Sequence, residues 1–247
     1  EGYLAVRTLR QEKVPINFTL GFSVRQNYLA ARLANPDFVN VFLGRLNQVV
    51  MDQNAGTGDL VGEKVTLATQ QALRSARESD KKVSSRLIAA SIRNGEQVAF
   101  LAGLDVLTIP PKAMKEYQDS GKQPDQVVSH IDDSIAPGID PQHPFAKRFS
   151  ELWQLSDEFK GFVDALVARP DLDSMQGEEL DKISRSVNLF HPCSDDDLNK
   201  IQEHGKIPDL NAWPDSVALD DLMTQSALQS FTKDQNALDE RIRSFLK

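Results

Sequence analysis

The stretch from Val14 to Arg45 has the pattern of a strand, a helix and a second strand, and this order restricts the possible folds most. The first expected strand, Val14 to Phe22, carries Asn17 and Thr19 among apolar residues. Side chains two positions apart on a strand point to the same face, so these two polar groups should lie together.

The second expected strand, Phe38 to Leu43, repeats this arrangement with Asn40 and Phe42 and leads to Arg45 just past a glycine. Polar groups on an inward face are costly to bury unless they are satisfied, so their presence near strand ends needs a reason. A catalytic pocket would provide one.

The same alternation continues beyond Arg45. A mobile loop is expected from Gln48 to Glu63, then a helix, a strand from Arg86 to Ser91, and a strand from Asp105 to Ile109. Strands that alternate with helices are typical of parallel βαβ units. We therefore expect residues 1–125 to form the second half of a (β/α)₈ barrel, and since four strands cannot close one, the first half should lie upstream or in another chain.

A doubly wound open sheet is the alternative architecture, but no glycine-rich dinucleotide turn follows any expected strand. Residues 126–144 are rich in aspartate, proline and glycine, which predicts a linker loop. Residues 145–247 show only helical patterns, including expected helices from Phe145 to Arg169 and from Asp220 to Phe245. We expect a helical extension there.

Composition excludes several classes of function. The chain has 247 residues and a formal net charge of −8, which disfavours general binding to nucleic acid or to anionic membranes. No apolar run reaches the roughly 18 residues of a transmembrane helix. The single cysteine, Cys193, fits a reducing compartment, so a cytoplasmic location is expected, with a homo-oligomer left open. The four histidines lack metal-site spacing, and we expect neither metal nor cofactor.

Two arginines, Arg45 and Arg93, follow directly after expected strands, on loops that would face one mouth of the barrel. Arginine donates paired hydrogen bonds to oxyanions, so the pair could grip a phosphate; surface ion pairing is the alternative. Asn17 and Thr19 could orient substrate hydroxyls or a water, or they could form a satisfied polar pair inside the barrel.

At this point the residues resemble a known family. Four motifs in order and spacing resemble transaldolase, covering roughly the first 115 residues: NFTLGFS at 17–23, FLGR at 42–45, ASIRN at 90–94 and LTIP at 107–110. The resemblance implies a class I mechanism of the pentose phosphate route, in which a lysine forms a Schiff base with a ketose phosphate and a dihydroxyacetone unit passes to an aldose phosphate.

By this resemblance Asn17 would bond donor hydroxyls, Thr19 would help to hold a catalytic water, and Phe42 would line the pocket. Arg45 and Arg93 would bind the phosphate of the sugar substrate. Asn40 stands where the family usually has serine, which leaves donor and acceptor preference open.

The family's Schiff-base lysine belongs on the strand before Glu1, and none of these residues replaces it, so we expect these 247 residues alone to be inactive. Two further interpretations stay open beside transaldolase. One is a related fructose-6-phosphate-type aldolase, which releases the triose, and the other is a non-catalytic module that binds sugar phosphates.

Overall fold

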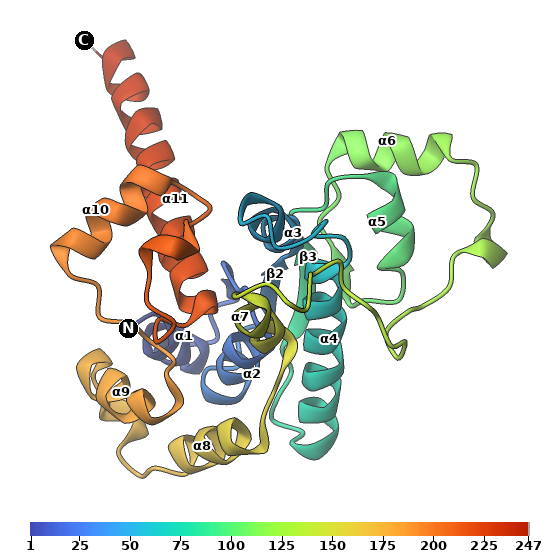
Figure 1. Ribbon diagram of the computed structural model, residues 1–247. Helices are drawn as coiled ribbons and strands as arrows, with labels where there is room; N and C mark the ends of the chain where they lie inside the picture. Colours follow the sequence, from blue (N-terminus) through green and yellow to red (C-terminus); the bar gives the residue numbers. More distant parts are fainter. Residues whose placement is uncertain (247) are drawn as a thin grey trace.

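The computed structural model describes residues 1–246, and a single parallel sheet organises its first half (Figure 1). The sheet has four strands in the order β1-β2-β3-β4, with the following bounds: β1 Asn17–Phe18, β2 Phe38–Phe42, β3 Arg86–Ala90 and β4 Val106–Leu107. Neighbouring strands are parallel throughout, and their order follows the chain without reversal. Every connection therefore returns to the same end of the sheet through a helix.

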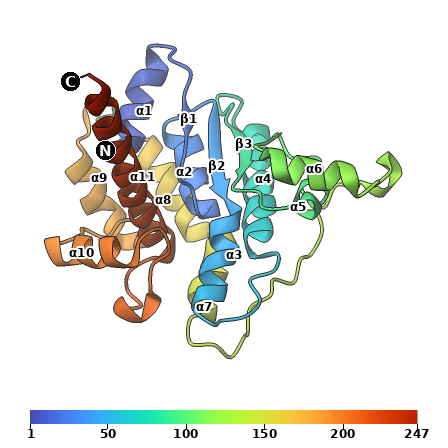
Figure 2. The same ribbon diagram turned by 90° about the horizontal axis from the view of Figure 1, so that it is seen from above.

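Helices make up most of the remaining chain. Those within the βα region are α1 Gly2–Gln11, α2 Val24–Leu33, α3 Leu43–Asp52, α4 Val61–Ser79, α5 Gly95–Phe100 and α6 Pro111–Asp119. Those of the extension are α7 Ala146–Ser150, α8 Asp157–Val167, α9 Gly177–Ser184, α10 Asp195–His204 and α11 Leu219–Phe245. Figure 2 shows α9, α10 and α11 of the extension on the side of β1 and α1, with α5 and α6 at the opposite side of the sheet.

The two faces of the sheet differ in how they are covered. Val39, Val41, Leu87 and Ala89 are fully buried on the face against which α2 and α4 pack (Figure 1). On the other face, Asn17 and the start of β3 are exposed, and Ile88, which pairs with Asn40 in the register, is only partly buried. A sheet with helices on one face and unreversed strand order is half of a (β/α)₈ barrel, and the doubly wound alternative does not fit.

Several expected boundaries shift by a few residues. The segment from Gln48 to Asp52, expected to be loop, continues α3, because Leu46, Val49 and Val50 recur at helical spacing and are fully buried. The helix expected over residues 145–169 is interrupted, because Ser156 caps a new helix by accepting a hydrogen bond from the Phe159 amide at 3.1 Å. The loop that remains between α3 and α4 covers residues 53–60.

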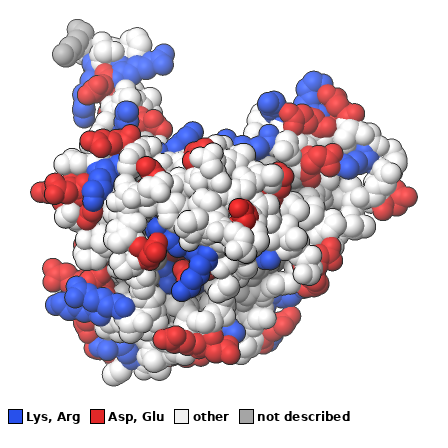
Figure 3. Space-filling view, in the orientation of Figure 1, with Lys and Arg blue, Asp and Glu red and all other residues white. Residues whose placement is uncertain are grey.

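The charged surface is mixed rather than one-signed. Figure 3 shows basic and acidic side chains interspersed on one face around a broad uncharged area. Among residues 1–246, no helix combines the length and the apolar composition needed to cross a membrane.

Candidate active site

Arg45 lies in the first turn of α3, directly after β2, and is the most deeply buried of the predicted site cations, with 9% of its surface exposed. Its guanidinium carbon lies 5.7 Å from the centroid of the Phe42 ring and 5.4 Å from that of Phe231 on α11. Its Nη1 atom is buried and has no hydrogen-bond partner within the described chain. A buried guanidinium left partly unsatisfied at strand carboxyl ends is available to a ligand.

Arg93 lies in the connection from β3 to α5, and its side chain is exposed. It lines the same cavity as Arg45, of about 510 Å³. A Cβ atom placed on Gly44 would lie 2.5 Å from Arg93 Nε, so the glycine before Arg45 allows Arg93 to lie against the first turn of α3. The structure therefore brings the two predicted arginines together.

The electrostatics around the two arginines favour an anion. Burial lowers the pKa of Arg45, and the nearby positive charge of Arg93 lowers it further, whereas Asp234 opposes the shift. Among the described residues, neither arginine has an ion-pair partner within 4.0 Å. Two neighbouring guanidiniums without a bonded carboxylate bind a phosphate well, because its oxygens accept the paired hydrogen bonds that arginine donates.

A chain of polar groups behind the cavity fixes both arginine-bearing segments. Gln97 accepts a hydrogen bond from the Arg93 amide at 2.6 Å and donates to Glu63 at 2.7 Å. Asn47 donates to the other oxygen of Glu63 at 3.0 Å and accepts from the Gly62 amide at 2.6 Å. Glu63 thus joins α4 to α3 and to the Arg93 segment, while only 3% of its own surface is exposed.

The directions of the hydrogen bonds in this network require a carboxylate at its centre. The backbone amides at both ends are donors, so each side-chain amide must present its oxygen to the backbone and its nitrogen to Glu63. Only a group with two acceptor oxygens satisfies both nitrogens. Sequence reasoning missed Glu63, Asn47 and Gln97, since their spacing carries no motif, and Glu63 falls within the loop expected from 48 to 63.

The predicted amide pair forms at the open face of the sheet. Asn40 Nδ2 donates to Asn17 Oδ1 at 2.5 Å and to the Phe18 carbonyl at 3.1 Å. Asn40 shares its strand face with Phe42, which contacts Arg45, so the amide pair and the arginine cavity are joined through β2. Thr19 is exposed, and within residues 1–246 its side chain makes no hydrogen bond.

Backbone strain also gathers at these strand ends. Leu20, directly after Thr19, has φ of 67°, and Ser91, directly after β3, has φ of 66°. Non-glycine residues in this left-handed region cost about 1–3 kcal/mol each and are concentrated at functional sites.

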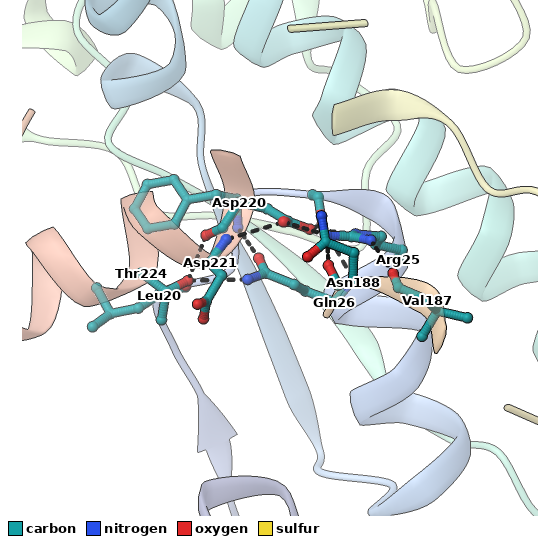
Figure 4. Close-up of polar contacts among 10 residues, drawn as sticks. Leu20, Arg25, Gln26, Val187, Asn188, Asp220, Asp221 and Thr224 are labelled. Carbon is teal, nitrogen blue, oxygen red and sulfur yellow. Dashed lines mark hydrogen bonds and ion pairs between the residues drawn. The ribbon is translucent and has the colours of Figure 1, made fainter. Parts of the chain in front are cut away.

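The helical extension is clamped to the loop that follows β1 (Figure 4). Asp220, at the start of α11, accepts two hydrogen bonds from Arg25 at 2.7 Å each and one from Ser23 at 2.6 Å. Thr224 donates to the Leu20 carbonyl at 3.1 Å. Burial alone would raise the pKa of Asp220, but the Arg25 charge and these hydrogen bonds hold it below its usual value. The clamp places α11, and with it Phe231, over Arg45.

None of the strands β1 to β4 contains a lysine, and Lys13, Lys81 and Lys82 are exposed. Lys64 donates to the Ile135 carbonyl at 2.7 Å and lies over the Trp153 ring. In the described part of the chain, no group of three or more His, Cys, Asp or Glu side chains could hold a metal ion. The arrangement can therefore bind an anion, and these strands do not provide a Schiff-base amine.

The fold and the site define a protein of the (β/α)-barrel class with a cavity lined by two arginines at the carboxyl ends of its strands. The chain belongs to the Transaldolase/Fructose-6-phosphate aldolase family, whose model matches residues 1–163.

Individual relatives are similar over part of their length. A "Probable transaldolase" of Dictyostelium discoideum is 28% identical over 158 residues, which are 64% of this chain and 48% of the relative. A "Probable transaldolase" of Thermus thermophilus is 36% identical over 118 residues, or 47% of this chain and 46% of the relative. A "Transaldolase" of Chlamydia caviae is 29% identical over 142 residues, or 58% and 42%. The matched segments thus span about half the length of these relatives.

Proposed function

We propose that this chain is part of a transaldolase of the pentose phosphate route, which transfers a dihydroxyacetone unit from a ketose phosphate to an aldose phosphate. The observation that supports this proposal most is the buried Arg45, which shares one cavity with Arg93 at the strand ends of a family member. Both guanidiniums bind the phosphate of the sugar, which holds the carbon skeleton in a fixed position relative to the open sheet face.

The amide pair has a specific part in this proposal. Asn40 Nδ2 donates a hydrogen bond to Asn17 Oδ1. The amide nitrogen of Asn17 can therefore donate to a hydroxyl of the ketose substrate. Asn40 thus fixes the orientation of Asn17 from the position where the family usually has serine. Thr19, exposed beside them, helps to hold the catalytic water, and Phe42 forms the pocket wall between the amides and Arg45.

The reaction requires an amine from outside these 247 residues. The lysine amine adds to the ketose carbonyl and loses water, which gives an iminium. A base then takes the proton of the β-hydroxyl, and the bond between the α and β carbons breaks, so that its electron pair converts the iminium into an enamine and an aldose phosphate leaves. The enamine then attacks the aldehyde of the acceptor, and hydrolysis releases the new ketose. We propose that residues 1–125 contribute half of the barrel, 126–144 a linker and 145–247 the helical extension.

Two experiments test the proposal. Fructose 6-phosphate should bind the 247-residue chain more tightly than fructose does in a calorimetric titration, and Arg45→Met should greatly reduce that preference. Borohydride treatment with fructose 6-phosphate should leave no covalent adduct on the 247-residue chain and a stable adduct on a lysine-containing protein that includes it. Equal binding of both sugars would contradict the phosphate site, and an adduct on the chain alone would contradict the missing lysine.

A related aldolase remains the second candidate, because the matching family description covers both activities. Product analysis of the lysine-containing protein with and without erythrose 4-phosphate separates them. A transaldolase depends on the acceptor, whereas an aldolase releases dihydroxyacetone without it. A non-catalytic module that binds sugar phosphates would show neither activity and no borohydride adduct.

A further inference from the structure

We propose that Lys206, in the loop that follows α10, is a third cation of the phosphate site. This inference rests on the proposed function of the Arg45 and Arg93 cavity and deepens it. Lys206 and its neighbour Ile207 line that same cavity, although they come from the helical extension rather than from a βα unit. Lys206 also lies beyond residues 1–163, the part that the family model matches.

The loop that carries Lys206 is fixed to the helix that carries Arg45. Gln53, the first residue after α3, donates from Nε2 to the Pro208 carbonyl at 3.1 Å and accepts at Oε1 from the Leu210 amide at 3.0 Å. Because the two ends of one amide bind two points of the loop, the loop can neither rotate nor slide freely against α3. Pro208 and Leu210 are both buried at this contact.

The chain turns toward the cavity at Gly205, which ends α10 with φ of 73°. L-residues rarely adopt this conformation, so glycine suits the turn. Lys206 follows directly and is exposed, which leaves its ammonium group at the rim of the cavity rather than in its wall. A lysine there is a mobile point charge that can reach any free phosphate oxygen, whereas the arginines impose a fixed geometry.

Charge balance supports the same role. Within the described chain Lys206 has no ion-pair partner, whereas Lys200, in the helix that precedes the loop, contacts Asp197 at 3.3 Å and the Trp213 ring at 5.3 Å. A phosphate ester carries about −1.5 to −2 charges at pH 7. Asp52 and Asp59 also line the cavity and formally balance the charge of the two arginines. A third cation restores a positive balance for a dianion.

The test compares fructose 6-phosphate with fructose by calorimetric titration of the 247-residue chain at low ionic strength. Lys206→Gln should weaken fructose 6-phosphate binding by about five- to tenfold, as expected for the loss of one charge-assisted contact at an exposed site. Fructose binding should not change, and Lys206→Arg should retain most of the affinity. Lys233→Gln is the matched control, because Lys233 lines the neighbouring cavity and not this one.

A double-mutant cycle tests the fixing of the loop. Gln53→Ala should weaken fructose 6-phosphate binding about threefold through the displaced loop, and it should add little once Lys206 is already glutamine. If Lys206→Gln and Lys233→Gln lost the same affinity for fructose 6-phosphate, the effect would come from the overall positive charge and not from a contact at the cavity. That result would overturn the inference. Unchanged binding in Lys206→Gln, with loss in Arg45→Met, would overturn it while the proposed function stands. A chain that does not bind fructose 6-phosphate at all would contradict both.

Discussion

Arg25, which is half-buried, and Arg45, which is buried, both contact α11, and their surroundings are opposite. Arg25 donates to both oxygens of Asp220 and to the carbonyls of Val187 and Asn188. Arg45 has the rings of Phe42 and Phe231 beside it, a second arginine nearby and a buried nitrogen without a partner in the described chain.

The difference appears in their proton affinities. Burial tends to lower the pKa of Arg25, but the Asp220 carboxylate outweighs this and raises it, whereas burial and the charge of Arg93 lower the pKa of Arg45. Arg25, a structural arginine, is paired with a carboxylate of the same chain. Arg45 has no such partner in the described chain, so its charge is available to a bound anion. The clamp stabilises the fold so that the cavity can remain unsatisfied.

The largest expected effect is on the clamp. Asp220→Ala removes the carboxylate and leaves Arg25 largely buried without a counter-ion, which should lower the free energy of unfolding by about 3–5 kcal/mol. Urea denaturation measures this change. Asp173→Ala is the control, because Asp173 pairs with Arg7 but is 65% exposed, and it should change the free energy of unfolding far less. Similar losses in both variants would remove the distinction between a clamp and a surface pair.

Arg45→Met should show the reverse pattern. Its removal relieves an uncompensated buried charge, so the melting temperature should stay the same or rise. Fructose 6-phosphate binding should weaken by about 2–3 kcal/mol, or roughly 30- to 150-fold, because a buried charge-assisted contact is lost. Calorimetry and thermal unfolding of one preparation separate the two effects. Arg86→Met, at the exposed start of β3, is the control and should change neither the affinity nor the melting temperature. If Arg45→Met lowered the stability and left the binding unchanged, Arg45 would be a structural arginine like Arg25.

Asp221, the residue after Asp220 in α11, should make the stability of the clamp depend on pH. Burial raises the pKa of Asp221 to about 6, although the His191 amide donates to it at 2.8 Å. The folded state then holds the proton more tightly than the unfolded state, so stability contributed by this group falls as pH rises from about 4 to 6. Asp221→Asn cannot ionise and should be more stable than wild type by about 3 kcal/mol at pH 7.5, with little difference at pH 4. Chemical denaturation at both values measures this. A constant difference across pH would contradict the assignment.

The two regions also differ in what the sequence could predict. The parallel sheet and the meeting of Arg45 with Arg93 follow from local periodicity, because each βα repeat returns its loop to the same edge. The pairing of Asp220 with Arg25 joins residues 195 positions apart, and nothing in their spacing indicates it. The sequence predicts Arg45 on a loop, whereas it lies in the first turn of α3, whose apolar spacing is clear once the start of the helix at Leu43 is known.

Glu63 gives the smallest and most specific expected effect. Glu63→Gln presents one amide nitrogen to Gln97 or Asn47, so a donor faces a donor, and neither partner can rotate its amide without the same conflict at the Arg93 or Gly62 amide. The expected cost is about 1–2 kcal/mol of stability, with a several-fold loss of fructose 6-phosphate affinity because the Arg93 segment loosens. Glu96→Gln, on an exposed side chain, is the matched control.

Because the conflict is one of polarity and not of volume, Glu63→Asp or Glu63→Leu cannot substitute for this test. Asp shortens the reach to both amides, and Leu removes both acceptors together. Only glutamine keeps the shape and changes a single acceptor into a donor. If Glu63→Gln left both stability and affinity unchanged, the carboxylate would not order the two arginine segments. The geometry of the cavity would then depend on the packing of α3 against α4 alone.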